Sequence, residues 1–85
     1  MTRDELSELD PELLFLSEPE YDEALVGVIE AFGGELRAAY NREKLLDIIA
    51  RNIGGLDAQE QAEEHFSFNI LGSYMGPRTP VYLIT

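Results

Sequence analysis

The first apolar segment of the chain is short and stands between two prolines. Residues 1–12 before it are polar and acidic, which suits either a frayed arm or one short helix. Residues 13–16 form a continuous apolar run between Pro11 and Pro19 that is too short for a helix to nucleate. We therefore expect an acidic N-terminal arm over residues 1–12 and a buried strand over 13–16, where a single domain covering 13–85 begins.

The apolar pattern over residues 24–32 fits both a helix and a strand. Gly27 lies in the middle of this segment and would cost about 1 kcal/mol inside a helix. Gly33 and Gly34 follow as a turn signal, and residues 36–40 form a plausible return strand. We therefore expect an antiparallel hairpin here.

A clear helical pattern follows the hairpin. Asn41 can cap a helix that Gly54 ends, because asparagine accepts from the first backbone N–H groups and glycine adopts the left-handed conformation. Asp47 and Arg51 stand four residues apart, so we expect an ion pair on the surface of this helix. Its apolar stripe consists of Leu45, Leu46, Ile48, Ile49 and Ile53.

A second helix is expected to start at Asp57, whose spacing to Glu60 is that of a capping box. It should end near Gly72 or Gly76, and Pro80 then begins a final strand over residues 80–84. One side of this helix carries Ala62, Phe66, Asn69, Ile70 and Ser73.

Together these elements predict an α+β fold. The expected order is β-β-β-α-α-β, with a small antiparallel or mixed sheet of about four strands packed against the two helices. No internal repeat is visible, and 85 residues are enough for one domain only.

The net charge of the chain limits the kinds of partner that it can bind. It has 17 acidic and 6 basic residues, a formal net charge of −11. Direct binding to DNA or RNA is disfavoured, because phosphate contacts need many lysines and arginines. An acidic surface that mimics nucleic acid stays open beside the plainer interpretation of a solvated, solubilising surface. The one compact basic cluster consists of Arg37, Arg42, Lys44 and Arg51.

The sequence gives no sign of export or of a membrane anchor. There are no cysteines, and hence no disulfide framework or thiolate chemistry. The longest uncharged stretch, residues 66–77, is well short of the roughly 20 residues that span a bilayer. Acidic residues stand at the start, where a signal peptide would be basic. We expect a cytoplasmic protein that does not contact membranes.

Few residues suggest catalysis. His65 is the only imidazole, and no metal-binding spacing accompanies it. Ser67 lies two positions away, about 200° around a helix, so the two side chains do not form a nucleophile–base pair. We expect no enzyme activity, no metal and no cofactor.

The candidate binding residues are polar or aromatic side chains next to apolar ones. Asn69 stands in the middle of an apolar stripe, where its amide needs hydrogen-bond partners. It either holds the backbone of residues 76–79 or anchors a small ligand, with Tyr74 and Arg78 nearby in sequence. Tyr21 and Asp22 are candidates for a protein interface, because tyrosine combines apolar area with a polar tip.

Two segments resemble the signatures of a family of small uncharacterised proteins encoded mainly in bacteriophage genomes. They are residues 21–28, with the sequence YDEALVGV, and 68–72, FNILG, continued by Gly76 and Thr79-Pro80. The resemblance covers about residues 21–83 and implies a viral origin and the cytoplasm of an infected bacterium. The chain has Asn41 and Ser67 where the family commonly has acidic residues, which argues against a shared carboxylate site.

Three functions remain as hypotheses. The favoured one is a small acidic, non-catalytic interaction protein, a phage accessory protein that binds a host or viral protein, in a sharper version as a nucleic-acid-mimicking inhibitor. The second is a small-ligand-binding module centred on Asn69. The third is a homo-oligomeric structural protein, because so small a core gains from burying apolar surface between copies.

Overall fold

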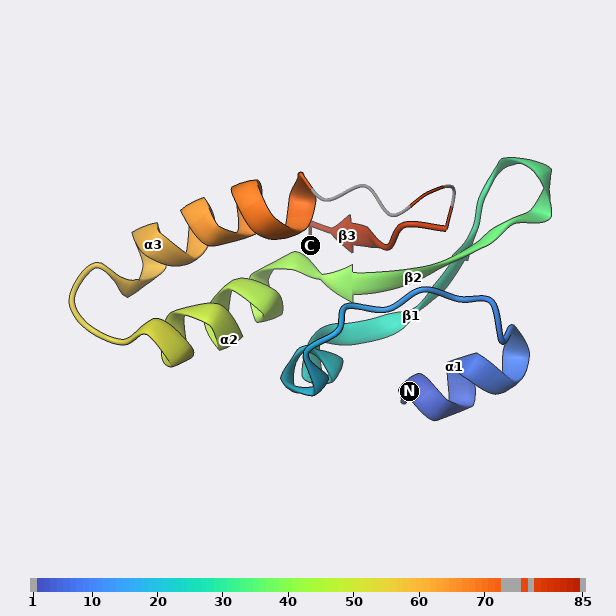
Figure 1. The fold of residues 1–85 in the computed structure, drawn as a ribbon, viewed down its shortest axis with the longest axis horizontal. Coiled ribbons are helices and arrows are strands. Elements are labelled where there is room, and N and C mark those ends of the chain that lie inside the picture. Colours follow the sequence, from blue (N-terminus) through green and yellow to red (C-terminus); the bar gives the residue numbers. More distant parts are fainter. Residues whose placement is uncertain (1, 73–75, 77, 85) are drawn as a thin grey trace.

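The computed structural model describes residues 2–72, 76 and 78–84. Figure 1 shows an α+β fold with a three-stranded sheet. The sheet has the order β1-β2-β3; β1 and β2 are antiparallel, whereas β2 and β3 are parallel. The elements are α1 (Arg3–Leu9), the 3₁₀ helix η1 (Pro19–Ala24), β1 (Leu25–Glu30), the 3₁₀ turn η2 (Phe32–Gly34), β2 (Leu36–Asn41), α2 (Arg42–Ile53), α3 (Ala58–His65), the π-helical η3 (Phe66–Leu71) and β3 (Val81–Leu83).

The predicted hairpin is confirmed. β1 and β2 pair from Leu25 opposite Tyr40 to Glu30 opposite Leu36. Gly33 and Gly34 have φ values of 85° and 80°, a conformation in which a side chain would be strained. A register shift between Leu25 and Gly27 interrupts the ladder. The local glycine signals were therefore sufficient to identify this unit.

The predicted first helix is also confirmed, as α2. The Asn41 side chain accepts a hydrogen bond from the Lys44 N–H at 2.9 Å, and Gly54 ends the helix with φ of 72°. Arg51 does not follow the prediction of a pair with Asp47. It donates instead to Glu23, 3.3 Å away on η1, because η1 packs against α2.

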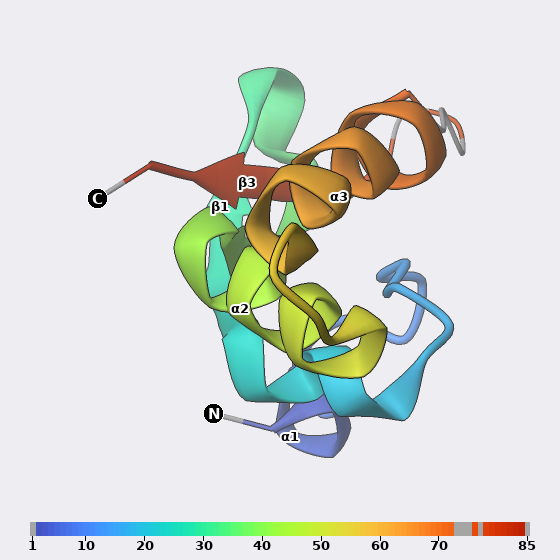
Figure 2. The same ribbon diagram turned by 90° about the vertical axis from the view of Figure 1, so that its left-hand side faces the viewer.

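The second helix differs from the prediction at its start. Asp57 stands at the N-cap of α3, but its side chain makes no capping hydrogen bond, so the expected capping box is absent. The helix continues through η3 to Gly72, one of the two predicted end points. α2 and α3 lie side by side and antiparallel, which Figure 1 and the end-on view of Figure 2 both show.

The strand predicted over residues 13–16 is wrong. Leu13 and Leu16 are buried, but the segment is an irregular chain. Two side chains bind the backbone groups of Leu16: its N–H donates to the Tyr40 hydroxyl at 3.0 Å, and Arg3 Nη2 donates to its carbonyl at 2.7 Å. A buried backbone needs such partners, and here side chains take the place of a neighbouring strand. Among the described residues, the sheet consequently has three strands rather than about four.

The acidic start forms a short helix, one of the two alternatives for residues 1–12. Thr2 caps α1 by accepting from the Glu5 N–H at 3.2 Å, and Leu6 is only 1% exposed. Arg3 donates to Asp22 at 2.7 Å, which fixes α1 to η1. The N-terminal segment thus contributes a side chain to the core.

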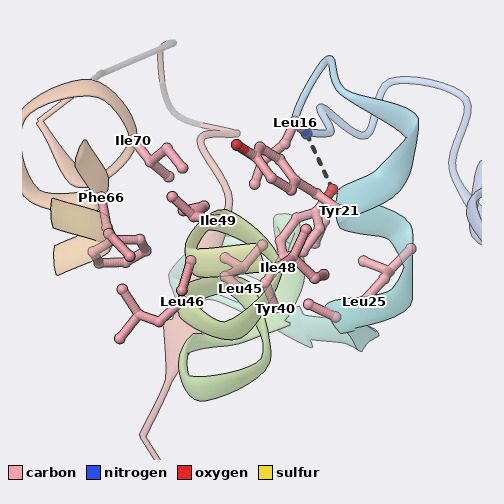
Figure 3. Close-up of a cluster of buried hydrophobic side chains, with 14 of the residues drawn as sticks. Leu16, Tyr21, Leu25, Tyr40, Leu45, Leu46, Ile48, Ile49, Phe66 and Ile70 are labelled. Atoms are coloured by element: carbon pink, nitrogen blue, oxygen red, sulfur yellow. Dashed lines mark hydrogen bonds between the residues drawn. The ribbon is translucent and has the colours of Figure 1, made fainter. Parts of the chain in front are cut away.

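The core surrounds α2, whose buried leucines and isoleucines face the sheet, η1 and α3 (Figure 3). Tyr40 is fully buried at the end of β2 and stacks on Tyr82 of β3, with 6.3 Å between ring centroids. Phe66 packs edge-on against Tyr82 at 5.1 Å, and the Arg42 guanidinium lies 5.1 Å from the centre of the Phe66 ring. These aromatic contacts connect the sheet to the end of α3. No helix in the described ranges is long and apolar enough to cross a bilayer.

The two stacked tyrosines allow a matched test of the buried hydroxyls. Tyr40→Phe leaves the buried N–H of Leu16 without its partner, so we expect a loss of about 1–3 kcal/mol in the free energy of unfolding. The Tyr82 hydroxyl is buried with no hydrogen-bond partner among the described residues, so Tyr82→Phe should be neutral or stabilising. Urea denaturation of both variants measures the difference, and equal losses would contradict it.

Alkaline pH should destabilise the protein through Tyr82. Burial raises the pKa of Tyr82 to about 12, and the neighbouring Tyr40 adds to the rise. The folded state therefore holds this proton more tightly than the unfolded state, whose tyrosines titrate near pH 10. Its contribution to stability is fully present below about pH 10 and is lost as the pH rises toward 12.

The measurement is the free energy of unfolding against pH, together with tyrosinate absorbance. Tyr82→Phe should flatten the loss of stability between about pH 10 and 12 and remove the most alkaline component of the absorbance titration. An unchanged slope in the variant would refute the assignment to Tyr82.

Candidate functional site

A groove lies between the irregular segment before η1 and the end of the α3–η3 helix. Its volume is about 390 Å³, within the range of small-molecule sites, which is roughly 300–1,000 Å³. One wall comes from residues 15–18 and from Tyr21, and the other from the turn between His65 and Ile70. The lining residues are Phe15, Leu16, Ser17, Glu18, Tyr21, His65, Asn69 and Ile70.

The wide turn of η3 shapes the second wall. The buried residues of this helix are Ala62, Phe66 and Ile70, each four positions apart. In an α-helix a step of four residues overshoots a full turn by about 40°, so three such positions drift away from one face. The wider π turn over Phe66–Leu71 reduces this drift and keeps Phe66 and Ile70 on the core side.

The same turn corrects the prediction for Asn69. We expected its amide in the middle of the apolar stripe, either bonded to the backbone of residues 76–79 or anchoring a small ligand. The structure leaves Asn69 exposed, and no hydrogen bond joins it to the described residues of that loop. Its Nδ2 lies 3.3 Å from His65 Nδ1, one turn earlier on the helix. Because an amide nitrogen only donates, Nδ1 accepts, which assigns the imidazole proton to Nε2. The Asn69 carbonyl oxygen and the His65 Nε2–H then remain available to a bound molecule.

Tyr21 is the most buried of the polar residues that line the groove. The residue is 6% exposed, and its ring extends toward Ile70 in Figure 3. Its hydroxyl makes no hydrogen bond within the part of the chain that the structure describes, and its oxygen is not one of the fully buried atoms that lack a partner. Burial raises the pKa of Tyr21, and the carboxylates of Glu18 and Glu20 raise it further. The hydroxyl is therefore neutral at physiological pH and lies in a negative field.

The other predicted binding residues lie elsewhere. Asp22 is beside Tyr21 in sequence but pairs with Arg3, away from the groove lining. Arg78 pairs with Asp10 at the opposite end of the chain. Tyr74 lies outside the described residues. The structure thus brings Tyr21 and Asn69 together, and it does not place Asp22 or Arg78 with them.

Sequence reasoning missed several lining residues. Phe15 and Leu16 were assigned to a strand, and Glu18 was not distinguished from the other acidic residues. His65 was not selected because no further residues at metal-binding spacing accompany it. The spacing of four from Ala62 to Ile70 also occurs on one face of a regular α-helix, so the sequence carried no clear signal of the π turn. That spacing places His65 and Asn69 on the same flank of the helix, next to its buried face.

A second hollow of about 710 Å³ lies where α2 turns into α3. It is larger, and two of its four charged wall residues, Glu23 and Arg51, pair with each other at 3.3 Å with exposed side chains; the other two are Lys44 and Asp47. Leu56 at its rim is 106% exposed. The buried polar atoms that lack a partner in the described ranges belong to the lining of neither hollow. The smaller groove is the candidate site because it brings together Tyr21 and Asn69, two of the predicted binding residues.

The outer side of α3 forms a third feature, which neither view in Figures 1 and 2 shows covered by another element. Spacings of three and four residues place successive side chains along one face of an α-helix. Phe68 and Leu71 lie in the π turn, and we assign them to this side from their exposure. We call these residues the outer ridge: Asp57, Glu60, Glu64, Phe68 and Leu71. Its second half is apolar, since Phe68 is 81% and Leu71 58% exposed. Exposed large apolar side chains that lie together are typical of interaction surfaces.

The described residues contain no group of three or more His, Cys, Asp or Glu side chains placed to hold a metal ion. No family model, curated protein or solved structure matches the chain.

The ion pair that closes the first wall of the groove gives a stability prediction. Arg3 binds both Asp22 and the Leu16 carbonyl, and the side chains of the pair are 30% and 33% exposed. Asp22→Asn should cost about 1–2 kcal/mol in the free energy of unfolding, because charged hydrogen bonds are stronger than neutral ones and this one connects two segments.

Glu23→Gln is the matched control. Its pair with Arg51 is 70% and 67% exposed, so its loss should stay within about 0.5 kcal/mol. Urea denaturation compares the two variants. Similar losses would show that the Arg3–Asp22 pair contributes no more than an ordinary surface pair.

Proposed function

We propose that the protein is a small non-catalytic interaction protein that binds a basic surface of another protein through the outer ridge. The resemblance of residues 21–28 and 68–72 to small proteins encoded mainly in bacteriophage genomes makes the cytoplasm of an infected bacterium the setting of this proposal. The partner is then a host or phage protein, and a nucleic-acid-binding protein is the sharper version.

The distribution of charge carries the proposal. Every acidic residue is exposed except Asp10, Asp22 and Glu35, and each of these three pairs with an arginine of the chain. Arg51 pairs with Glu23, and Arg42 lies over the Phe66 ring. The five arginines are thus engaged within the molecule, and Lys44 is the exposed basic residue that remains, so the unpaired charges at the surface of the described residues are almost all negative. Such a surface attracts cationic partners and repels phosphates.

The outer ridge combines this charge with apolar anchors. Glu60 and Glu64 precede Phe68 by two turns and one turn of the same helix, and Leu71 follows it. Interfaces gain most of their affinity from a few large side chains that enter pockets of the partner, and complementary charges around them set orientation and association rate. Phe68 is the residue that best fits the first role.

The experiment is affinity capture from a nuclease-treated bacterial lysate at about 50 and 200 mM salt, with identification by mass spectrometry. We expect a basic protein that is retained at low salt and largely lost at high salt, because screening weakens attraction between exposed charges. Phe68→Ser should weaken binding by about 30-fold, the effect of losing an anchor worth roughly 2 kcal/mol.

Val26→Ser is the matched control, since Val26 is 49% exposed but lies on β1. It should leave capture unchanged. The contribution of the charges is tested with two double variants. Glu60→Gln with Glu64→Gln removes two charges from the outer ridge, and Glu30→Gln with Glu43→Gln removes two charges elsewhere on the surface. Capture that is indifferent to salt, or equally weakened by the controls, would contradict binding through the outer ridge.

A further inference from the structure

The groove beside Tyr21 has the features of a small-molecule site that is separate from the outer ridge. Its floor is apolar, formed by Phe15, Leu16 and Ile70. Its polar groups are few and come from both walls, which is the usual composition of a pocket that orients a ligand. The two walls belong to segments more than forty residues apart, so the groove exists only in the folded chain.

The Tyr21 hydroxyl is accessible from the groove. The residue as a whole is buried, but its oxygen is not among the fully buried polar atoms that lack a partner, so a molecule in the groove can reach it. Tyr21 is 6% exposed, lines the groove and lacks a partner among the described residues. A molecule in the groove that accepts from this hydroxyl, or donates to it, would satisfy it.

The charges of the lining select the kind of molecule. Glu18 is the one residue of the lining that is negatively charged, and no lysine or arginine is part of the lining. The Ser17 hydroxyl donates to Glu18 Oε2 at 3.1 Å, which leaves the other carboxylate oxygen free. Arg3, which lies over the Phe15 ring, is already bound to Asp22 and to the Leu16 carbonyl. A positive group is therefore favoured at the mouth of the groove, and a negative group is not.

We propose that this groove binds a small organic cation, a protonated amine carried on a flat apolar body. The ammonium group lies at Glu18, the apolar body packs on Phe15 and Ile70, and polar groups of the ligand meet the Tyr21 hydroxyl and the Asn69 carbonyl oxygen. The hydrogen bond from Asn69 to His65 holds that amide in place. This binding goes beyond the proposed protein interaction and does not depend on it.

The test is an NMR titration of the full chain with three probes of similar size and different charge: 2-phenylethylamine, 2-phenylethanol and phenylacetate. We expect 2-phenylethylamine to shift the backbone amides of residues 15–21 and 65–70 in a saturable way, with an affinity on the order of 1 mM for so small a molecule. 2-Phenylethanol should bind about tenfold more weakly, and phenylacetate should not saturate.

Two variants and one control complete the test. Glu18→Gln should remove the preference for 2-phenylethylamine over 2-phenylethanol, and Tyr21→Phe, which keeps the ring in the core, should weaken both. Glu30→Gln makes the same change of charge at the far end of β1 and should leave the titration unchanged. Equal binding of the amine and the alcohol to the unmodified protein would overturn the proposal. So would shifts that spread beyond the groove, or a preference that survives Glu18→Gln.

Discussion

The hydroxyl of Tyr40 is the contact on which the arrangement of the molecule depends. It stands at the end of β2, and it holds the backbone of Leu16 where no strand is present to do so. Its ring stacks on Tyr82 and so connects the hairpin to the last strand. The Tyr40 side chain thereby connects the N-terminal segment, the hairpin and β3. Tyr82 of β3 in turn contacts Phe66 at the end of α3, next to the groove.

The groove and the outer ridge show how one helix can serve two surfaces. The π turn directs Phe66 and Ile70 inward, while Phe68 and Leu71 remain outside. His65 and Asn69 lie on the flank between these two sides. Within the six residues of this wide turn, the helix has a core side, a groove side and a solvent side.

The parts of the fold that could be predicted are those with local causes. The glycine pair of the hairpin and the Asn41 cap act within a few residues, and both were found. The strand at residues 13–16 was wrong because an apolar run does not reveal that Tyr40 and Arg3 would bind its backbone. The predicted environment of Asn69 was wrong because the prediction assumed an α-helical period throughout, whereas Phe66–Leu71 form a π turn. Tyr21 and Asn69 were selected as binding residues. That they line the same groove depends on the tertiary structure, which local sequence patterns do not predict.

The pair between Arg78 and Asp10 connects the last part of the chain to the first. Its side chains are 22% and 19% exposed, so neither charge is fully hydrated. A shortened form that lacked either terminal segment would leave the remaining charge of the pair without its partner. The segments that carry Asp10 and Arg78 consequently stabilise each other through this ion pair, and removing one segment destabilises the other.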